Sequence, residues 1–168
     1  MADTNKGRKF FISATVAAGP IPEPAPSDLL LTDYEALKWT EVTHVGSIGE
    51  TGTDTNIVSY DELATDVTQK KKGISNAGDP EIEVARLASD PGQQAMRTAG
   101  AAKGFYAFKI EDNDLPTTGT LPTPTTYYMR GLVTGPKRPN GRNEDFNLEV
   151  YTLGLTQYEI IKEAQSTP

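Results

Sequence analysis

Most of the chain alternates between apolar and polar residues at a spacing of two, which is the pattern of half-buried β-strands. The alternation is clearest in 104–111, where Tyr106, Phe108 and Ile110 would share one face of a strand. Segments rich in glycine and proline separate these runs, as turns separate strands. The predicted strands cover residues 9–16, 39–48, 57–60, 66–75, 81–87, 104–111, 126–133, 145–152 and 156–161.

Two of these strands are predicted to pair with each other. The residues Asn-Ala-Gly-Asp-Pro at 76–80 predict a tight turn, so strands 66–75 and 81–87 should form an antiparallel hairpin.

The strand 39–48 would place His44 on one face together with apolar neighbours. The apolar run at 9–16 favours a strand over an export signal, because polar residues interrupt it.

One segment departs from the alternation and predicts an α-helix, over about residues 90–102. Asp90 can cap the first N–H groups, Pro91 suits the first helical position, and Gln93 lies where a capping box requires it. Met96 and neighbouring alanines form a narrow apolar stripe. A helix this short is marginal by itself, so we expect it to pack on a β-sheet.

Together these elements predict a mainly β fold, either a β-sandwich or a small barrel with one flanking helix. The chain is expected to form a single domain over residues 1–168. A proline-rich arm at 19–28 and a Pro/Thr loop at 112–125 should lie outside the sheet, since proline cannot donate to an inner ladder. A short helical turn capped by Thr32 and a tail at 165–168 complete the prediction.

Composition narrows the possible functions. The chain has 16 Lys and Arg against 23 Asp and Glu, with a formal net charge of −7. This balance disfavours specific binding to nucleic acid, which depends on cations that neutralise phosphates. Cysteine is absent, which excludes disulfides, thiolate metal sites and cysteine nucleophiles. No run of apolar residues is long enough for a membrane-spanning helix.

The sequence offers no convincing catalytic, cofactor-binding or metal site. His44 is the only histidine, so a multi-histidine metal site is excluded, and a structural role is expected for it. The acidic segment 111–114 lacks the ligand spacing of a calcium loop. Glu81 and Glu83 could in principle serve a glycosidase, but nothing in the sequence marks a cleft around them. We therefore predict a protein that is not an enzyme.

Two concentrations of basic residues contrast with the acidic background, one in strand 66–75 and one in the loop 135–143. Nucleic-acid binding, protection of a strand edge, and contact with acidic patches on a neighbouring copy all remain open. For the third interpretation, the acidic segment that follows strand 104–111 is the expected counterpart. The candidate interface residues are Lys70, Lys71, Lys72, Glu111, Asp112 and Asp114.

The order of these motifs resembles the tail tube (major tail) proteins of long-tailed bacteriophages. The resemblance lies in YEALKWTEVTHVGSIGETG (34–52), NIVSYDELATDVTQKKKGISNAGDPEIEVAR (56–86), DPGQQAMRTAG (90–100) and YAFKI (106–110). It includes a glycine-spaced loop after a strand, a lysine-rich K-K-G strand, a G-D turn and a D-P-G-Q helix start. It covers almost half of the chain, and the later strands agree more loosely.

The resemblance implies a non-catalytic β-sandwich subunit that forms hexameric rings, stacked into the tube of a virion tail. Its implied partners are copies of itself, a tape-measure protein, and tail terminator and initiator proteins, and DNA would pass through without specific binding. Assembly would take place in the cytoplasm of a bacterial host, with no membrane contact. The loops 49–56 and 112–125 would contact adjacent rings, and the bore would be negatively charged.

Two alternatives from other functional classes stay open. One is a non-catalytic β-sandwich module of a virion or pilus that binds a carbohydrate or a receptor. The single tryptophan, Trp39, gives little support for an aromatic sugar platform. The other alternative is a hydrolase that uses carboxylates.

Overall fold

The computed structural model describes residues 4–13 and 28–167, and the predicted arm at 19–28 lies outside this part except for its last residue. The mainly β fold is confirmed. The two helices in the described residues are α1 (Leu31–Glu35) and α2 (Pro91–Ala101). The strands there are β1 (Lys9–Ile12), β2 (Thr40–Val42), β3 (Val45–Ile48), β4 (Asp54–Tyr60), β5 (Gln69–Asn76), β6 (Glu81–Ala85), β7 (Tyr106–Glu111), β8 (Thr120–Thr123), β9 (Thr126–Lys137), β10 (Leu148–Leu155), β11 (Ile160–Lys162) and β12 (Gln165–Thr167).

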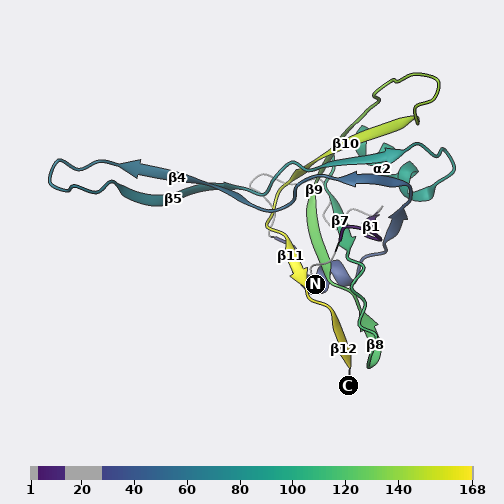
Figure 1. Cartoon of the computed structure of the whole chain (residues 1–168), viewed down its shortest axis with the longest axis horizontal. Coiled ribbons are helices and arrows are strands. Elements are labelled where there is room, and N and C mark those ends of the chain that lie inside the picture. Colours follow the sequence, from purple (N-terminus) through teal and green to yellow (C-terminus); the bar gives the residue numbers. More distant parts are fainter. Residues whose placement is uncertain (1–3, 14–27, 168) are drawn as a thin grey trace.

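Most strands belong to one antiparallel sheet with the order β2-β1-β7-β9-β10-β6-β3 (Figure 1). The long strand β9 lies at its centre, pairing with β7 along its first half and with β10 along its second half. The short strand β11 extends the sheet beside the first residues of β9. Gly131 permits the close approach of β10, because a Cβ atom at this position would lie 2.2 Å from the carbonyl oxygen of Gly154.

The sheet is rolled, because its two edge strands are nearly consecutive in the chain. β2 and β3 stand at opposite ends of the strand order, yet only Thr43 and His44 separate them. Such a short connection spans at most about 11 Å, so the two edges meet at this corner. Of the two predicted architectures, this arrangement is closer to the small barrel.

The predicted single strand 39–48 is therefore wrong, and its interruption has a local cause. His44 has φ 59, a left-handed conformation that ends the extended run. Its carbonyl oxygen accepts a hydrogen bond of 2.9 Å from the N–H of Ala85 in β6. The carboxylate of Asp90 accepts hydrogen bonds from both the N–H and the hydroxyl of Thr43, at 3.3 and 2.8 Å. Asp90 thus holds the corner as well as the helix.

The predicted helix is confirmed as α2, including its N-terminal cap and its apolar stripe. The N–H of Gln93 donates to the Asp90 carboxylate at 2.8 Å, and Pro91 is the first helical residue. Met96 and Ala99 are fully buried against the inner face of the sheet. Gly92 lets the helix touch β2, since a Cβ atom there would lie 2.0 Å from the Glu41 carbonyl oxygen.

A smaller cluster on the opposite face of β7 and β9 buries Tyr34 of α1 against Ala107 and Tyr128. The Tyr34 and Tyr128 rings stack with their centroids 5.2 Å apart. The helical turn was predicted, but its cap was not placed correctly. The helix begins at Leu31, so its N-cap residue is Leu30 and not Thr32. The N–H of Leu30 donates to the Asp33 carboxylate at 2.9 Å.

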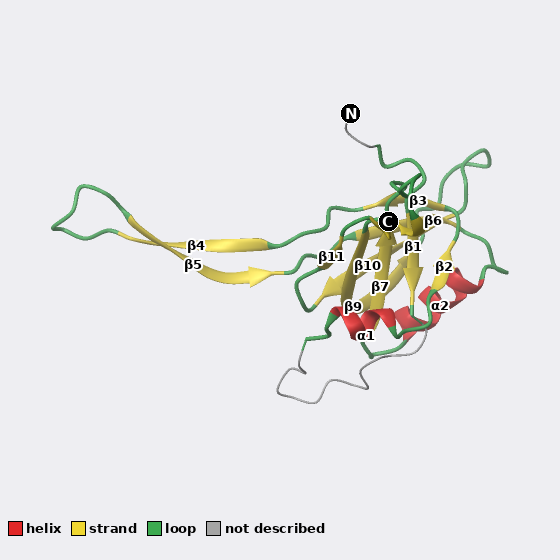
Figure 2. Ribbon diagram, turned by 90° about the horizontal axis from the view of Figure 1, so that it is seen from below, coloured by secondary structure: helices red, strands yellow, loops and turns green. Residues whose placement is uncertain are grey.

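Two separate two-stranded sheets extend from the main sheet. β4 and β5 pair only with each other among the described strands and project far to one side of the molecule (Figures 1 and 2). The predicted hairpin of 66–75 with 81–87 is therefore wrong, because β6 lies between β10 and β3 instead. The Pro/Thr loop contains β8, which pairs with β12, so the predicted tail at the end of the chain is a strand.

Candidate assembly surface

The most conspicuous surface feature is the β4–β5 hairpin (residues 54–76). It is called the arm from here on and is distinct from the proline-rich segment 19–28. Strands of this length reach about 25 Å from the body. A two-stranded hairpin in water is marginally stable at best, because neither face is covered. The arm nevertheless carries exposed apolar side chains on its strands and at its tip: Ile57, Val58, Tyr60, Leu63, Val67 and Ile74. This combination is typical of a segment that is buried against another molecule.

The arm is also divided by charge. Its tip, residues 61–68, contains Asp61, Glu62 and Asp66 and no basic residue. The adjoining strand β5 carries the three consecutive lysines 70–72, which pair in register with residues 57–59 of β4. All these charged side chains are exposed. An acidic tip next to a basic stretch of strand favours a partner with a complementary arrangement of charges.

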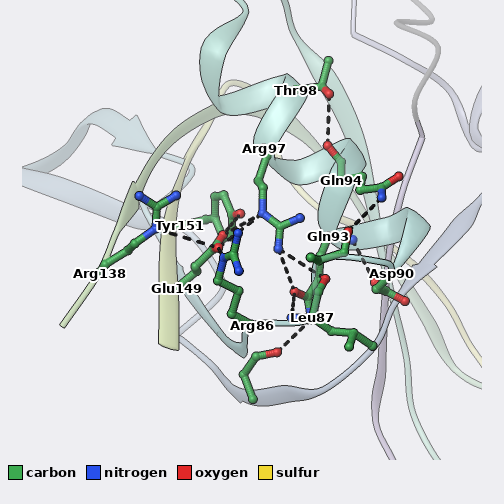
Figure 3. A network of polar contacts seen from close by, with 12 residues as sticks. Arg86, Leu87, Asp90, Gln93, Gln94, Arg97, Thr98, Arg138, Glu149 and Tyr151 are labelled. Atoms are coloured by element: carbon green, nitrogen blue, oxygen red, sulfur yellow. Dashed lines mark hydrogen bonds and ion pairs between the residues drawn. The ribbon is translucent and has the colours of Figure 1, made fainter. Parts of the chain in front are cut away.

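A second charged feature lies on the body, where arginines surround the buried carboxylate of Glu149 (Figure 3). The Glu149 side chain is completely inaccessible to solvent. It accepts a hydrogen bond of 2.5 Å from the Tyr151 hydroxyl and one of 3.1 Å from the Arg97 Nε. The Nε atoms of Arg86 and Arg138 lie 2.9 and 3.9 Å from its Oε1 atom. We call these three arginines and Glu149 the arginine cluster.

The electrostatics of the arginine cluster keep Glu149 ionised although it is buried. Burial by itself raises the pKa of Glu149, but hydrogen bonds from Tyr151 and Arg97 and the charges of Arg97 and Arg138 outweigh it and lower the pKa below 4.5. Burial, together with the adjacent carboxylate, raises the pKa of the Tyr151 hydroxyl. With three guanidinium groups around one carboxylate, the cluster keeps an excess of positive charge.

The amide of Gln93 connects the arginine cluster to the rolled corner. Its Nε2 atom donates to the carbonyl oxygens of Thr43 and Ala85 at 3.0 and 2.9 Å. Its Oε1 atom accepts from the N–H of Leu87 at 2.8 Å and from Nη2 of Arg97 at 3.2 Å. All the hydrogen-bonding groups of this fully buried side chain are thus satisfied. Gln93 does not make the reciprocal capping-box bond that the sequence predicts.

The residues predicted for the interface lie in separate parts of the molecule. Lysines 70–72 are on the arm, whereas the acidic segment 111–114 begins at the last residue of β7 in the body. Within one chain these acids already have partners. Glu111 pairs with Lys109 at 2.7 Å, and Asp112 pairs with Arg8 at 2.5 Å. Asp114 accepts hydrogen bonds from the N–H and the hydroxyl of Thr125. Contact of these groups with a neighbouring copy stays a prediction.

The described residues contain no group of three or more His, Cys, Asp or Glu side chains that could hold a metal ion. His44 is exposed at the corner and does not share a strand face with Val42 and Ile48. Among the residues described, no helix has the length and apolar character needed to cross a membrane.

The arginine cluster is the feature that the sequence reasoning missed. The sequence contains one signal that could have found it. Glu149 alternates with Tyr151, Leu153 and Leu155, all of which face the interior of the sheet. An acidic residue in register with a buried apolar face requires a cationic partner, because an isolated buried carboxylate is strongly unfavourable.

Comparisons with known proteins relate the chain to others through its fold alone. No family model and no curated protein matches its sequence. Among solved structures, a chain of the sheath/tube terminator of the PVC extracellular contractile injection system, in the extended state, matches with a TM-score of 0.64. The match has 9% identity and covers 96% of this chain and 97% of that one.

Two further matches come from the anti-feeding prophage. A chain of its six-fold symmetrised baseplate matches with a TM-score of 0.60 and 9% identity, over 97% of this chain and 98% of that one. A chain of its tube-terminating cap matches with a TM-score of 0.57 and 12% identity, over 97% and 93%. At these identities the matches show a shared fold over nearly the whole chain.

Proposed function

We propose that this chain is a structural, non-catalytic subunit of a phage-like tail or contractile injection apparatus, and that it forms a ring at one end of the tube. The observation that carries this proposal is the shared fold over 96% of the chain with a chain of a sheath/tube terminator. The match to a chain of a tube-terminating cap supports the same position in the assembly. The partners would be copies of this chain and the tube and sheath subunits.

The arm gives a physical reason for assembly. Its exposed apolar side chains lie on both strands and at the tip, and an uncovered two-stranded hairpin is marginal. Docking on a neighbouring copy would remove this surface from water. The arm projects from one side of the body (Figure 2). The surface that receives it on the neighbouring copy would therefore not be that copy's own arm. Such a head-to-tail contact produces a ring when the rotation between copies closes.

A second candidate is a subunit of the tube itself, as the sequence resemblance over 34–110 implies. The two functions differ in what limits growth. A ring subunit at the tube end would form particles of one size, whereas a tube subunit would stack into filaments that lengthen with protein concentration. In either case a tape-measure protein and initiator proteins would be further partners, and DNA would pass without specific binding.

The test is electron microscopy and light scattering of the purified chain, alone and with tubes from a contractile injection system. Rings of one size that bind to tube ends are the expected result. Filaments of rings would favour the tube subunit. A protein that stays monomeric at every concentration, and does not bind tubes, would contradict both. If that monomer binds a glycan on an array, the binding-module alternative is correct.

An arm-deletion variant tests the physical reason separately. Asp54 and Asn76 are paired in register, so a two-residue Asn-Gly turn can join them in place of residues 55–75. We expect this variant to keep the circular dichroism spectrum and melting temperature of the body but to form no rings. Rings of unchanged size from the variant would show that the arm is not required.

A further inference from the structure

We infer that Arg86 and Arg138 form the receiving site for the acidic arm tip of a neighbouring copy. The inference rests on the proposed self-assembly and names the groups that would meet. It assigns carboxylates as the ligand class of the arginine cluster, and a second copy of this chain as their source. Arg97 and Glu149 bind groups of their own chain, Arg86 and Arg138 are partly exposed, and the arm tip is acidic.

Within the arginine cluster, Arg97 uses its Nε and Nη2 atoms for acceptors of its own chain. Its Nε atom donates to Glu149, and its Nη2 atom donates to the Leu87 carbonyl oxygen at 3.3 Å and to Gln93 at 3.2 Å. Glu149 is likewise satisfied, since it is buried among these donors and the Tyr151 hydroxyl. These groups form the rigid base of the site.

Arg86 and Arg138 differ, because their guanidinium ends are open to solvent. Their side chains are 38% and 52% exposed, and each faces Glu149 through Nε. Their terminal nitrogens have no further partner among the described residues. Two partly exposed guanidinium groups beside one buried carboxylate, with donors left for another molecule, match the oxygen atoms of incoming carboxylates.

The arm tip supplies that chemistry and lacks an intrachain partner. Asp61, Glu62 and Asp66 lie within six consecutive residues, and none of them forms an ion pair among the described residues. From residue 54 to residue 69 the chain has no lysine or arginine. The tip is therefore the most acidic part of the arm, and the body presents the matching cationic site.

The tip cannot reach the arginine cluster of its own chain. The arm projects from one side of the body, whereas α2, which carries Arg97, lies on the other (Figure 1). The contact must therefore join different copies, and because tip and cluster are different surfaces, it is head-to-tail. Each copy gives one tip and receives one, as a closed ring requires.

The experiment is a charge exchange. The tip variant carries Asp61→Lys, Glu62→Lys and Asp66→Lys, and the receiver variant carries Arg138→Glu. Arg86 is left in place because it lies closer to buried Glu149. Each variant alone sets like charges against each other, and we expect its apparent association constant to fall about tenfold or more. Asp54→Lys and Arg142→Glu are the matched controls, and both should assemble as the unmodified chain does.

Mixing provides the decisive readout. In an equimolar mixture, the basic tip of one variant faces the acidic receiver of the other, and the unmodified tip faces the unmodified receiver. We expect the mixture to recover assembly to within about threefold of the unmodified chain. A chain that carries both changes should assemble with itself but not with the unmodified chain. Failure of the mixture to assemble, while both variants remain folded, would overturn the inference.

Cross-linking gives a second measurement that does not depend on affinity. Because the chain has no cysteine, Glu62→Cys and Arg138→Cys introduce the only thiols. A short bismaleimide should join residue 62 of one copy to residue 138 of another in a mixture of the two variants. A Lys103→Cys variant, at an exposed position two residues after α2, is the control and should not link to residue 62.

The outcomes separate this inference from the proposed function. If the unmodified chain forms rings but the tip and receiver variants form them equally well, the inference fails and the proposed function stands. If the unmodified chain forms no assembly under any condition, both fail. If Arg138→Glu abolishes retention on duplex DNA and leaves ring formation unchanged, the arginines bind phosphate and the inference is overturned.

Discussion

Replacing Glu149 with glutamine tests whether the arginine cluster stabilises the fold through a buried charge. The substitution keeps the size of the side chain and one carbonyl oxygen, but removes the negative charge. It also places amide hydrogens where the carboxylate now accepts from Arg97 and Tyr151. The expected result is a loss of folding stability that depends on pH.

The magnitude follows from the contacts. Glu149 is completely buried, and hydrogen bonds to charged groups contribute about 1.5–3 kcal/mol each, against about 0.5–1.5 for neutral pairs. Loss of the charge weakens the bonds from Arg97 and Tyr151 and leaves donors facing donors. Arg86 and Arg138 are 38% and 52% exposed, so solvent screens their share. We expect Glu149→Gln to lower the free energy of unfolding by about 3 kcal/mol.

The pH dependence has a definite sign. The pKa of Glu149 lies below its ordinary value of 4.5 in the folded chain, so its stabilisation is fully present above pH 4.5. It disappears as the pH falls through the folded pKa, because the carboxylate becomes protonated. The difference between the unmodified chain and Glu149→Gln should therefore be largest near neutral pH and shrink in acid.

The assay is urea denaturation followed by circular dichroism, at a protein concentration below that of assembly, between pH 3 and pH 7. Glu81→Gln, at an exposed position on β6, is the control and should change stability by no more than about 0.5 kcal/mol. A loss below about 1 kcal/mol for Glu149→Gln, or an equal loss at every pH, would refute the argument.

Three further substitutions test other contacts. Gly92→Ala should destabilise the fold by at least about 2 kcal/mol in thermal melting, because its Cβ atom would lie 2.0 Å from the Glu41 carbonyl oxygen. Asp90→Ala removes both the helix cap and the hydrogen bonds to Thr43. It should lower the free energy of unfolding in urea by about 2 kcal/mol, compared with about 1 kcal/mol for the loss of a cap alone. Leu63→Ser at the arm tip should leave the melting temperature unchanged but weaken assembly in light scattering, and an unchanged assembly would exclude a role for this side chain.

The parts of the fold that local sequence determines were predictable. The helix α2 has its cap, its first-turn proline and its apolar stripe within eleven residues, and the structure confirms all three. β7 was predictable for the same reason, because its alternation lies in consecutive positions.

The parts that depend on distant residues were not predictable. The turn at 76–80 suggests a local hairpin, but β6 instead pairs with β10, more than sixty residues away in the chain. His44 carries no sign of a corner, since a left-handed conformation at a residue other than glycine is uncommon. The arginine partners of Glu149 come from the residue after β6, from α2 and from the residue after β9, so no single sequence window contains the arginine cluster.

The strand order has a consequence for how the protein is made. The central strands β9 and β10 come from residues 126–155, so the ribosome synthesises them after every other strand of the sheet except β11. Strands β6 and β7 lack their central partners β10 and β9 until then, so the full sheet must form after most of the chain has emerged. A polypeptide that is released before residue 126 therefore lacks the middle of its sheet, although it already contains the whole arm.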